Sequence, residues 1–285
     1  HQPELLSEQC PIHTRNWRTQ MNSWEGEKDL ARTQQMFSLS MVCYLLLSLL
    51  TVSVQADELA ARILPLRERA ALQDEIMLDR LETLVPSLMR REGIEAWVII
   101  GREYNEDPVL KTMLPATWLN ARRRTVLMFI DRGERGVERL AVARYAVGSL
   151  FPGAWDPETQ PDQYQRIAEL LEEADPNKIA LNTSDDYALA DGLTYSEQRD
   201  FASALSPTLR SRVVSAEALA VGWLETRTEK EMEVYADVMA IAHAIIAEGF
   251  SRRAIEPGST TTEDLEWWFR QRVHDLGLRT WFHNS

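Results

Sequence analysis

The pattern of apolar and polar positions divides the chain into three kinds of sequence. Residues 36–54 form one nearly continuous apolar stretch. Between residues 57 and 224, short apolar runs alternate with amphipathic stretches, and residues 225–285 carry apolar positions at helical spacing. Residues 1–35 show neither helical nor strand periodicity, so we expect them to be an unstructured upstream segment.

The stretch from 57 to 224 predicts an α/β domain. Continuous apolar runs at 96–101 and 125–130 are typical of strands that are buried on both faces of a sheet. Weaker patterns predict strands at 139–144, 178–181 and 212–214, and helices at 66–91 and 162–173. Pro86 marks a kink or a fresh start in the first helix, because proline lacks the backbone donor that a helix interior needs. Strands that alternate with helices predict a mixed α/β layer structure.

After a short helix that ends at Leu224, two amphipathic helices follow. The first continues to about Phe250, and the second is expected to begin with a capping box formed by Thr260 and Glu263 and to stop at Gly277. Leu278–Ser285 is expected to begin a strand. Because the second helix carries Trp267-Trp268-Phe269, the pair needs a surface to bury against. We expect this surface to be a sheet that the chain does not encode; the alternative is that the first domain covers these faces.

The apolar stretch near the start predicts export. Its most apolar part, Met41–Leu50, spans 10 residues. A spanning helix needs about 20 apolar residues, whereas the core of a signal peptide needs about 7–15. Val54 and Ala56 supply small residues at a cleavage site, so we expect 36–56 to be a cleaved signal peptide of a periplasmic or secreted protein. The alternative is an uncleaved membrane anchor, in which case the protein would contact a membrane.

Charge and cysteine content exclude several kinds of chemistry. The chain has 31 basic and 44 acidic residues and a formal charge of −13, which argues against a nucleic-acid partner. The one basic run, Arg122–Arg124, lies directly before an apolar run and indicates the entrance of a strand rather than a phosphate clamp. Both cysteines, Cys10 and Cys43, precede Ala56, so a mature chain would have no disulfide, thiolate metal site or cysteine nucleophile.

The last third of the chain resembles the pita-bread domain of the creatinase/aminopeptidase P group of metallopeptidases. The resemblance lies in the order of three features: Arg227-Thr228-Glu229-Lys230-Glu231, a long helix, and Pro257-Gly258-Ser259-Thr260 before an acidic helix start. Trp281-Phe282-His283 is similar to a segment of Xaa-Pro peptidase-like members. The resemblance implies a creatinase-like N-terminal mixed-sheet domain over 57–224, followed over 225–285 by the first helices of an incomplete pita-bread domain.

The same resemblance implies a metallopeptidase as the parent protein. Family members hold two divalent metal ions with two Asp, one His and two Glu and act on peptides, some as homo-oligomers. All five ligands are expected beyond Ser285, so we assign no catalytic residue and no metal ligand to this chain and expect it to be inactive alone. Two alternatives remain open: a metal-free module for binding or oligomerisation, and an amidinohydrolase similar to creatinase.

Three histidines follow residue 57, and one of them is a candidate for substrate binding. His283 lies in the Trp-Phe-His segment, and the resemblance places that segment near the active-site cradle; the alternative is an ordinary strand residue. His243 is expected to be a packed or surface residue of its helix. His274 is expected to interact favourably with the C-terminal dipole of its helix.

Two polar loops complete the candidates. Glu103–Pro108 follows the first predicted strand, where loops of α/β proteins often carry function. Its acidic residues would recognise a substrate amino terminus or reach a neighbouring subunit, or else form a solvated turn with Asp107 before proline. Ser184-Asp185-Asp186 is expected to be a polar loop or a helix cap.

Overall fold

The computed structural model describes Leu59 and residues 61–280. Residues 1–62 and 63–285 form two units, and all the helices and strands named below lie in the second unit. The predicted segments 1–35 and 36–56 lie outside the described residues. Within the described part of the chain, no helix combines the length and the apolar character that a membrane crossing requires.

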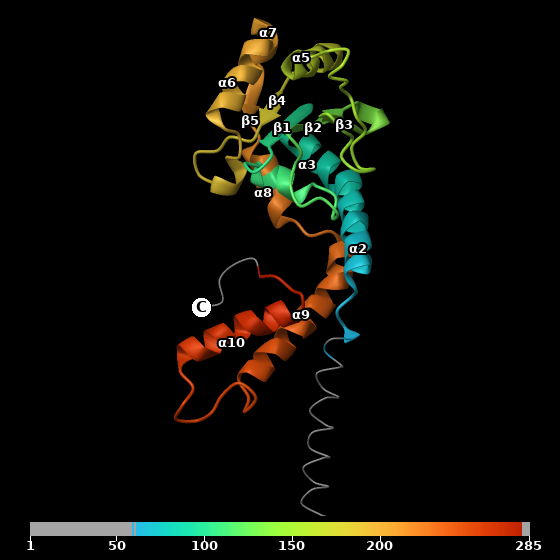
Figure 1. The fold of residues 1–285 in the computed structure, drawn as a ribbon. Helices are drawn as coiled ribbons and strands as arrows, with labels where there is room; N and C mark the ends of the chain where they lie inside the picture. Colours follow the sequence, from blue (N-terminus) through green and yellow to red (C-terminus); the bar gives the residue numbers. More distant parts are fainter. Residues whose placement is uncertain (1–58, 60, 281–285) are drawn as a thin grey trace, which may run out of the picture. The chain divides into compact units, whose positions relative to one another are not determined.

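A five-stranded mixed sheet organises the fold and confirms the predicted α/β class (Figure 1). Its strands lie in the order β3-β2-β1-β4-β5; β1 is antiparallel to β2 and parallel to β4, β2 is antiparallel to β3, and β4 is parallel to β5. In the register, Val98 lies opposite Met128 on one side and Leu181 on the other. The bounds are β1 Ala96–Arg102, β2 Arg124–Asp131, β3 Val137–Val142, β4 Ile179–Leu181 and β5 Val213–Ser215.

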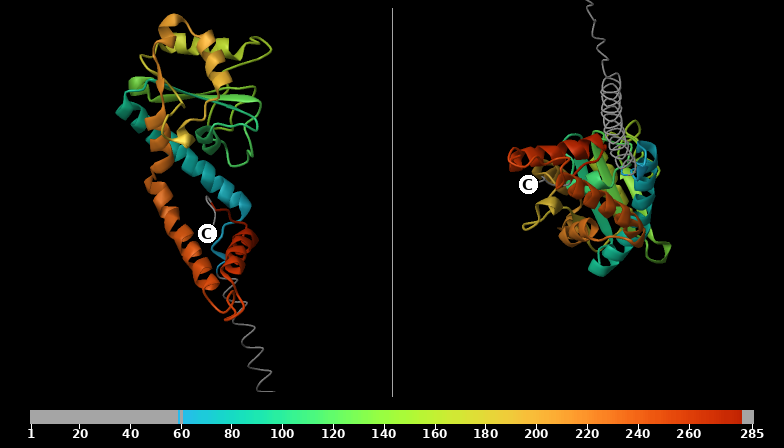
Figure 2. Two further views of the ribbon diagram at one scale, coloured as in Figure 1. Left: turned by 90° about the vertical axis from the view of Figure 1, so that its left-hand side faces the viewer. Right: turned by 90° about the horizontal axis from the view of Figure 1, so that it is seen from below.

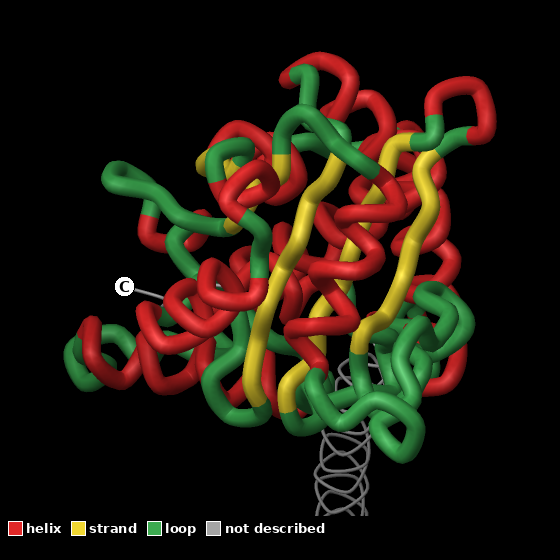
Figure 3. Tube along the Cα trace, turned by 90° about the horizontal axis from the view of Figure 1, so that it is seen from above, coloured by secondary structure: helices red, strands yellow, loops and turns green. Residues whose placement is uncertain are grey.

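Helices cover both faces of this sheet, as the continuous apolar runs predict (Figures 1 and 3). Side chains of a strand alternate between faces, so Trp97 and Phe129 pack with the first group of helices, whereas Val98 and Met128 pack with the second. The first group is α2 Leu66–Asp79, a π-helical turn at Arg80–Leu84, α3 Val85–Glu92, α4 Pro108–Thr112 and α8 Glu217–Glu225. The second group is α5 Gln163–Ala174, α6 Tyr195–Ala204 and α7 Pro207–Arg210.

The predicted fresh helix start at Pro86 is not what the structure shows. The chain is helical without a break from Leu66 to Glu92, and a π-helical turn directly precedes the segment that contains Pro86. The π-helical turn before it contains the buried residues Arg80, Leu81 and Leu84. Gly93 closes α3 with a φ of 63°, in the left-handed region that glycine adopts without strain.

The two C-terminal helices form a hairpin, α9 Glu229–Gly249 and α10 Thr262–Asp275 (Figure 2). Thr228 caps α9 in a capping box with Glu231. The predicted box of Thr260 and Glu263 is wrong by one residue, because Thr261 caps α10 together with Asp264. The Thr260 hydroxyl instead accepts a hydrogen bond from the backbone N–H of Glu256 at 2.8 Å, which ties the Pro257-Gly258 turn.

The hairpin leaves much of its apolar surface exposed. Only Ile245 and Gly249 are buried in α9, and no residue is buried in α10. We call the large exposed apolar residues of the hairpin the apolar row: Met232, Tyr235, Val238, Met239, Ile246, Phe250 and Trp267. The strand predicted to begin at Leu278 is absent over Leu278–Thr280, and the rest of that prediction lies outside the described residues.

Candidate binding site beside helix α9

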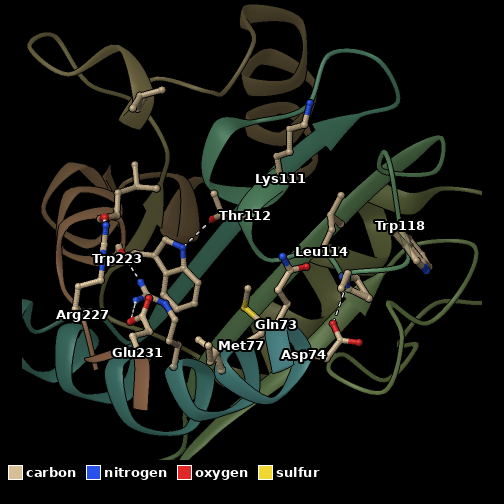
Figure 4. Close-up of a pocket in the computed structure, with 16 residues that line it drawn as sticks. Gln73, Asp74, Met77, Lys111, Thr112, Leu114, Trp118, Trp223, Arg227 and Glu231 are labelled. Carbon is tan, nitrogen blue, oxygen red and sulfur yellow. Dashed lines mark hydrogen bonds and ion pairs between the residues drawn. The ribbon is translucent and has the colours of Figure 1, made fainter. Parts of the chain in front are cut away.

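A cavity of about 680 Å³ lies between α2, the segment from α4 to Trp118, the end of α8 and the start of α9 (Figure 4). Its apolar wall consists of Met77, Leu114, Trp118, Leu189, Trp223 and Leu224. Its polar side chains are those of Gln73, Asp74, Arg80, Lys111, Thr112, Arg227 and Glu231. The site therefore joins the α/β domain to the segment that carries the resemblance to pita-bread peptidases.

Trp223 is held by a hydrogen bond at its indole N–H and by a cation at its ring. Its indole N–H donates to the Thr112 hydroxyl at 2.8 Å, and that hydroxyl donates to the carbonyl of Val109 at 2.7 Å. The Arg80 guanidinium lies 4.3 Å from the centre of the indole ring, within cation–π range. Because both sides of the ring system are held, the cavity has a rigid aromatic wall.

Arg80 also holds the end of α8 against the beginning of α9. Its guanidinium donates to the carbonyls of Trp223 and Thr226. These carbonyls lie at the C-terminal end of α8, where backbone oxygens have no partner within the helix. The guanidinium donates as well to the Glu231 carboxylate, at 2.5 Å. The same carboxylate oxygen accepts a hydrogen bond from the backbone N–H of Thr228 at 2.8 Å. Glu231 therefore both completes the cap of α9 and neutralises the charge of Arg80.

Most polar groups of the cavity are therefore already satisfied by the protein. The Asp74 carboxylate accepts the backbone N–H of Ala116 at 2.8 Å, and the Arg227 guanidinium donates to the carbonyls of Leu224 and Thr226. Lys111 is exposed at the rim. The Thr112 hydroxyl accepts from Trp223 and donates to the carbonyl of Val109, so the arrangement suits binding of a partly apolar ligand rather than nucleophilic catalysis.

Neither His243 nor His274 lines this cavity. His243 lies exposed on α9, as expected, and His274 lies in the last turn of α10. His283, the candidate for substrate binding, lies outside the described residues. In the part of the chain that the structure describes, no group of three or more His, Cys, Asp and Glu side chains is placed to hold a metal ion.

The loop after β1 is more ordered than a solvated turn. The reading of Asp107 as a solvated residue is wrong, because Asp107 has 0% exposure and caps α4 by accepting the N–H groups of Val109 and Leu110 at 2.8 and 3.0 Å. Its carboxylate also accepts the Asn182 amide at 3.0–3.1 Å, and the Asn182 carbonyl accepts the indole N–H of Trp97. Burial raises the pKa of Asp107 above its ordinary value, although these hydrogen bonds oppose the shift.

The other acidic residues of this loop also serve backbone groups. Glu103 accepts the N–H of Arg123 at 3.2 Å, and Glu106 accepts the N–H of Ala121 at 3.1 Å. Ser184 behaves as the expected polar loop residue, since its hydroxyl accepts the N–H groups of Asp186 and Tyr187 and donates to Glu217 at 2.6 Å. In both loops, these polar side chains therefore stabilise the local backbone.

The sequence alone did not point to Arg80 or Trp223 as residues of a site. Arg80 lies within a predicted helix, where arginine is ordinarily solvent-exposed. The available indication was the proximity of Trp223 to Arg227 and Glu231, which belong to the resembling segment. Nothing in the local pattern says that a residue some 150 positions earlier would join them.

No known protein family model matches the chain, and no curated protein matches it in sequence. Among solved structures, a Xaa-Pro dipeptidase from Bacillus anthracis is similar, with 17% sequence identity and a TM-score of 0.42. The similarity covers 69% of this chain and 48% of that chain, so this chain spans about half the length of that dipeptidase. At this identity and TM-score, the likeness supports no statement about activity.

Proposed function

We propose that this chain is the N-terminal portion of an exported hydrolase of the pita-bread fold, similar to Xaa-Pro aminopeptidases, and that it is inactive on its own. In this proposal, residues 57–224 form the creatinase-like domain and residues 225–285 begin the catalytic domain. The parent would act on peptides with two divalent metal ions, as a homo-oligomer. The proposal assigns no metal ligand to this chain, and it assigns substrate binding to His283.

The observation that carries the proposal is the apolar row on α9 and α10. Phe250 is 68% and Trp267 is 59% exposed, although their helices are capped at their starts and closed by a tight turn. Covering a large apolar side chain gains roughly 1.5–3 kcal/mol, so seven such residues along one hairpin favour a covering element. A curved catalytic sheet is the element that the resemblance implies at this place.

The resembling motifs also have a structural role that fits a junction between domains. Glu231 caps α9 and pairs with Arg80 of the α/β domain. Gly258 has a φ of 83° in the turn that returns the chain to α10. These residues set the direction of both helices. Their order in the sequence is the order expected where the chain passes from one domain into the next.

Hydrolysis of a Xaa-Pro peptide tests the proposal. The chain alone and the product of its gene read beyond Ser285 are each incubated with an Ala-Pro peptide and Mn²⁺. We expect no cleavage by the chain alone, and cleavage by the longer product that EDTA removes and that weakens, through a higher KM, in His283→Gln.

Three results separate the alternatives. Hydrolysis of creatine instead of the peptide would indicate the amidinohydrolase. A longer product without an Asp…Asp…His…Glu…Glu series and without hydrolysis would indicate the binding or oligomerisation module, which the exposed apolar row also favours. Cleavage of the peptide by the chain alone would overturn the proposal.

A further inference from the structure

A second cavity, at the edge of the sheet where β1 ends and β2 begins, is rich in arginine. The guanidinium groups that line it belong to Arg102, Arg122, Arg123, Arg124 and Arg144. The chain as a whole carries a formal charge of −13, so five arginines around one cavity depart sharply from its average composition. This cavity is separate from the one beside α9, since the two share no lining residue.

The sheet topology gathers these arginines from three places in the sequence. Arg124 is the first residue of β2, which confirms the predicted strand entrance, and it lies opposite Arg102, the last residue of β1. Because β2 and β3 are antiparallel, the end of β3 reaches the same edge and brings Arg144 there. The topology thus adds two arginines to the basic run that the sequence shows.

A buried carboxylate fixes two of the five guanidinium groups. The carboxylate of Glu197, which is 2% exposed, forms ion pairs with Nε of Arg102 at 3.1 Å and with Nε of Arg124 at 2.8 Å. The Tyr164 hydroxyl donates to the same carboxylate, and the Arg124 guanidinium lies 4.7 Å from the Tyr164 ring. Burial and the bond to Glu197 raise the pKa of Tyr164 above its ordinary value, so the phenol remains a neutral donor.

The remaining arginines leave a positive balance. Arg144 pairs with the exposed Glu158 at 3.4 Å, whereas the Arg122 guanidinium contacts the Trp118 and Tyr145 rings at 5.1 and 5.9 Å. Among the described residues, no hydrogen bond or ion pair is formed by the guanidinium groups of Arg122 or Arg123. Five arginines line the cavity with one carboxylate, that of Glu103, while Glu158 and Glu197 pair with three of these arginines from outside the lining.

The backbone of both cavity loops is held in an unusual conformation. Tyr104 and Arg123 have φ values of 67° and 56°, in the left-handed region that residues other than glycine seldom adopt. The loops are tied together, because the N–H of Glu103 donates to the carbonyl of Arg123 at 2.7 Å and the N–H of Arg123 donates to the Glu103 carboxylate. Observed backbone strain of this kind gathers at binding sites.

We propose that this arginine cavity binds the phosphate monoester group of a small molecule. The run Arg122–Arg124 would then serve both as the strand entrance and, contrary to the expectation from the sequence, as part of a phosphate site. A phosphate monoester carries a charge close to −2 at pH 7, which complements the excess of positive charge in the cavity, and guanidinium groups match its oxygens in bidentate geometry. Arg122 and Arg123 supply unpaired donors, while Arg102 and Arg124 are held in place by Glu197. Exposed Tyr104 and Tyr145 in the cavity wall offer ring faces to the organic part of the ligand.

Calorimetric titration of the full chain with AMP, adenosine and inorganic phosphate tests this assignment. We expect AMP to bind saturably with a Kd below about 1 mM, phosphate to compete with it, and adenosine not to bind. Binding should weaken as NaCl is raised and as the pH falls below about 6, where the monoester loses its second charge.

The variant Arg122→Gln/Arg123→Gln should weaken AMP binding at least ten-fold, because it removes the two unpaired cations while sparing the buried Glu197 network. The matched control, Arg67→Gln/Arg135→Gln, removes the same charge at two exposed positions outside the cavity and should leave binding unchanged. Equal affinity for AMP and adenosine, no saturable binding, or equal losses in both double variants would overturn the proposal.

Discussion

The Arg80 guanidinium and the Glu231 carboxylate lie 2.5 Å apart, and this ion pair joins the α/β domain to helix α9. Both side chains are largely shielded, at 8% and 18% exposure. The pair is embedded in further contacts, since Arg80 also binds two carbonyls at the end of α8 and Glu231 also caps α9. It therefore fixes the direction in which the hairpin leaves the domain.

Removing Arg80 should be strongly destabilising. Arg80→Met leaves the Glu231 carboxylate and the α8 carbonyls without their donor, and breaking a shielded pair from one side costs about 3–5 kcal/mol. Urea unfolding measures the change in the free energy of unfolding. Arg132→Gln is the control, because it breaks the more exposed pair with Glu138 and should cost less than about 1 kcal/mol. Equal costs for the two variants would contradict the role given to Arg80.

Asp107 should make stability depend on pH in the acidic range. Its pKa in the folded state is raised above its ordinary value of 3.8, so the folded protein holds this proton more tightly than the unfolded chain does. This tighter proton binding adds to the free energy of unfolding. The added stability is complete below about pH 3.8 and is lost as the pH rises through the folded-state pKa.

The variant Asp107→Asn isolates this contribution from that of the other carboxylates. We expect the free energy of unfolding of the wild type, taken relative to the variant, to fall as the pH rises from 3 to 7 in a series of urea titrations. If the free energy of unfolding of the wild type relative to the variant instead rises with pH, the folded state prefers the charged carboxylate, which would contradict the effect expected from burial.

Gly249 should be needed for the close contact between α9 and α10. A Cβ atom at this position would lie 2.3–2.4 Å from the ring of Phe269, so the ring must move. Gly249→Ala would otherwise stabilise a helix by about 1 kcal/mol, and we instead expect a net loss of about 1–3 kcal/mol from overpacking. Thermal unfolding followed by circular dichroism measures this loss of stability. Adding Phe269→Leu to the Gly249→Ala variant should restore part of it. A more stable Gly249→Ala variant would show that the helices do not meet there.

Export should produce a mature chain that begins at Asp57. The most apolar part of the stretch, Met41–Leu50, is shorter than a spanning helix requires, and Val54 and Ala56 supply small residues at the −3 and −1 positions. Mass spectrometry of the intact protein from the exported fraction measures the new N-terminus. Recovery of a membrane-bound chain that retains Met36 would favour the anchor instead.

The sequence predicts the elements whose patterns are long or strongly apolar. Strands β1 and β2 follow continuous apolar runs, and α9 and α10 follow apolar positions three and four residues apart. Helices α4 and α7 span only 5 and 4 residues, too few for a helical period to be recognised, and α6 is mostly polar. The capping box of α10 is displaced by one residue because two successive threonines offer equivalent caps.

The sites depend on contacts that local patterns do not carry. Arg80 and Glu231 are separated by 151 positions, and only the packing of α2 beside the start of α9 brings them together. The arginine cavity likewise requires the strand order, since Arg102 and Arg144 reach the basic run through pairing of β1 and β3 with β2. The reading of Asp107 as solvated failed because its burial results from contacts with Asn182 and Gly192 on a distant segment.

The proposed function depends on the apolar row of α9 and α10 acting as a docking face, and the large side chains of this row are exposed. The most direct measurement is analytical ultracentrifugation of residues 57–285 in parallel with fluorescence of a hydrophobic dye, for the wild type and for Met239→Lys/Phe250→Lys. We predict that the wild type binds the dye and self-associates, and that the variant does neither while keeping its circular dichroism spectrum. A wild-type chain that is monomeric and does not increase the fluorescence of the dye would contradict this role of the apolar row.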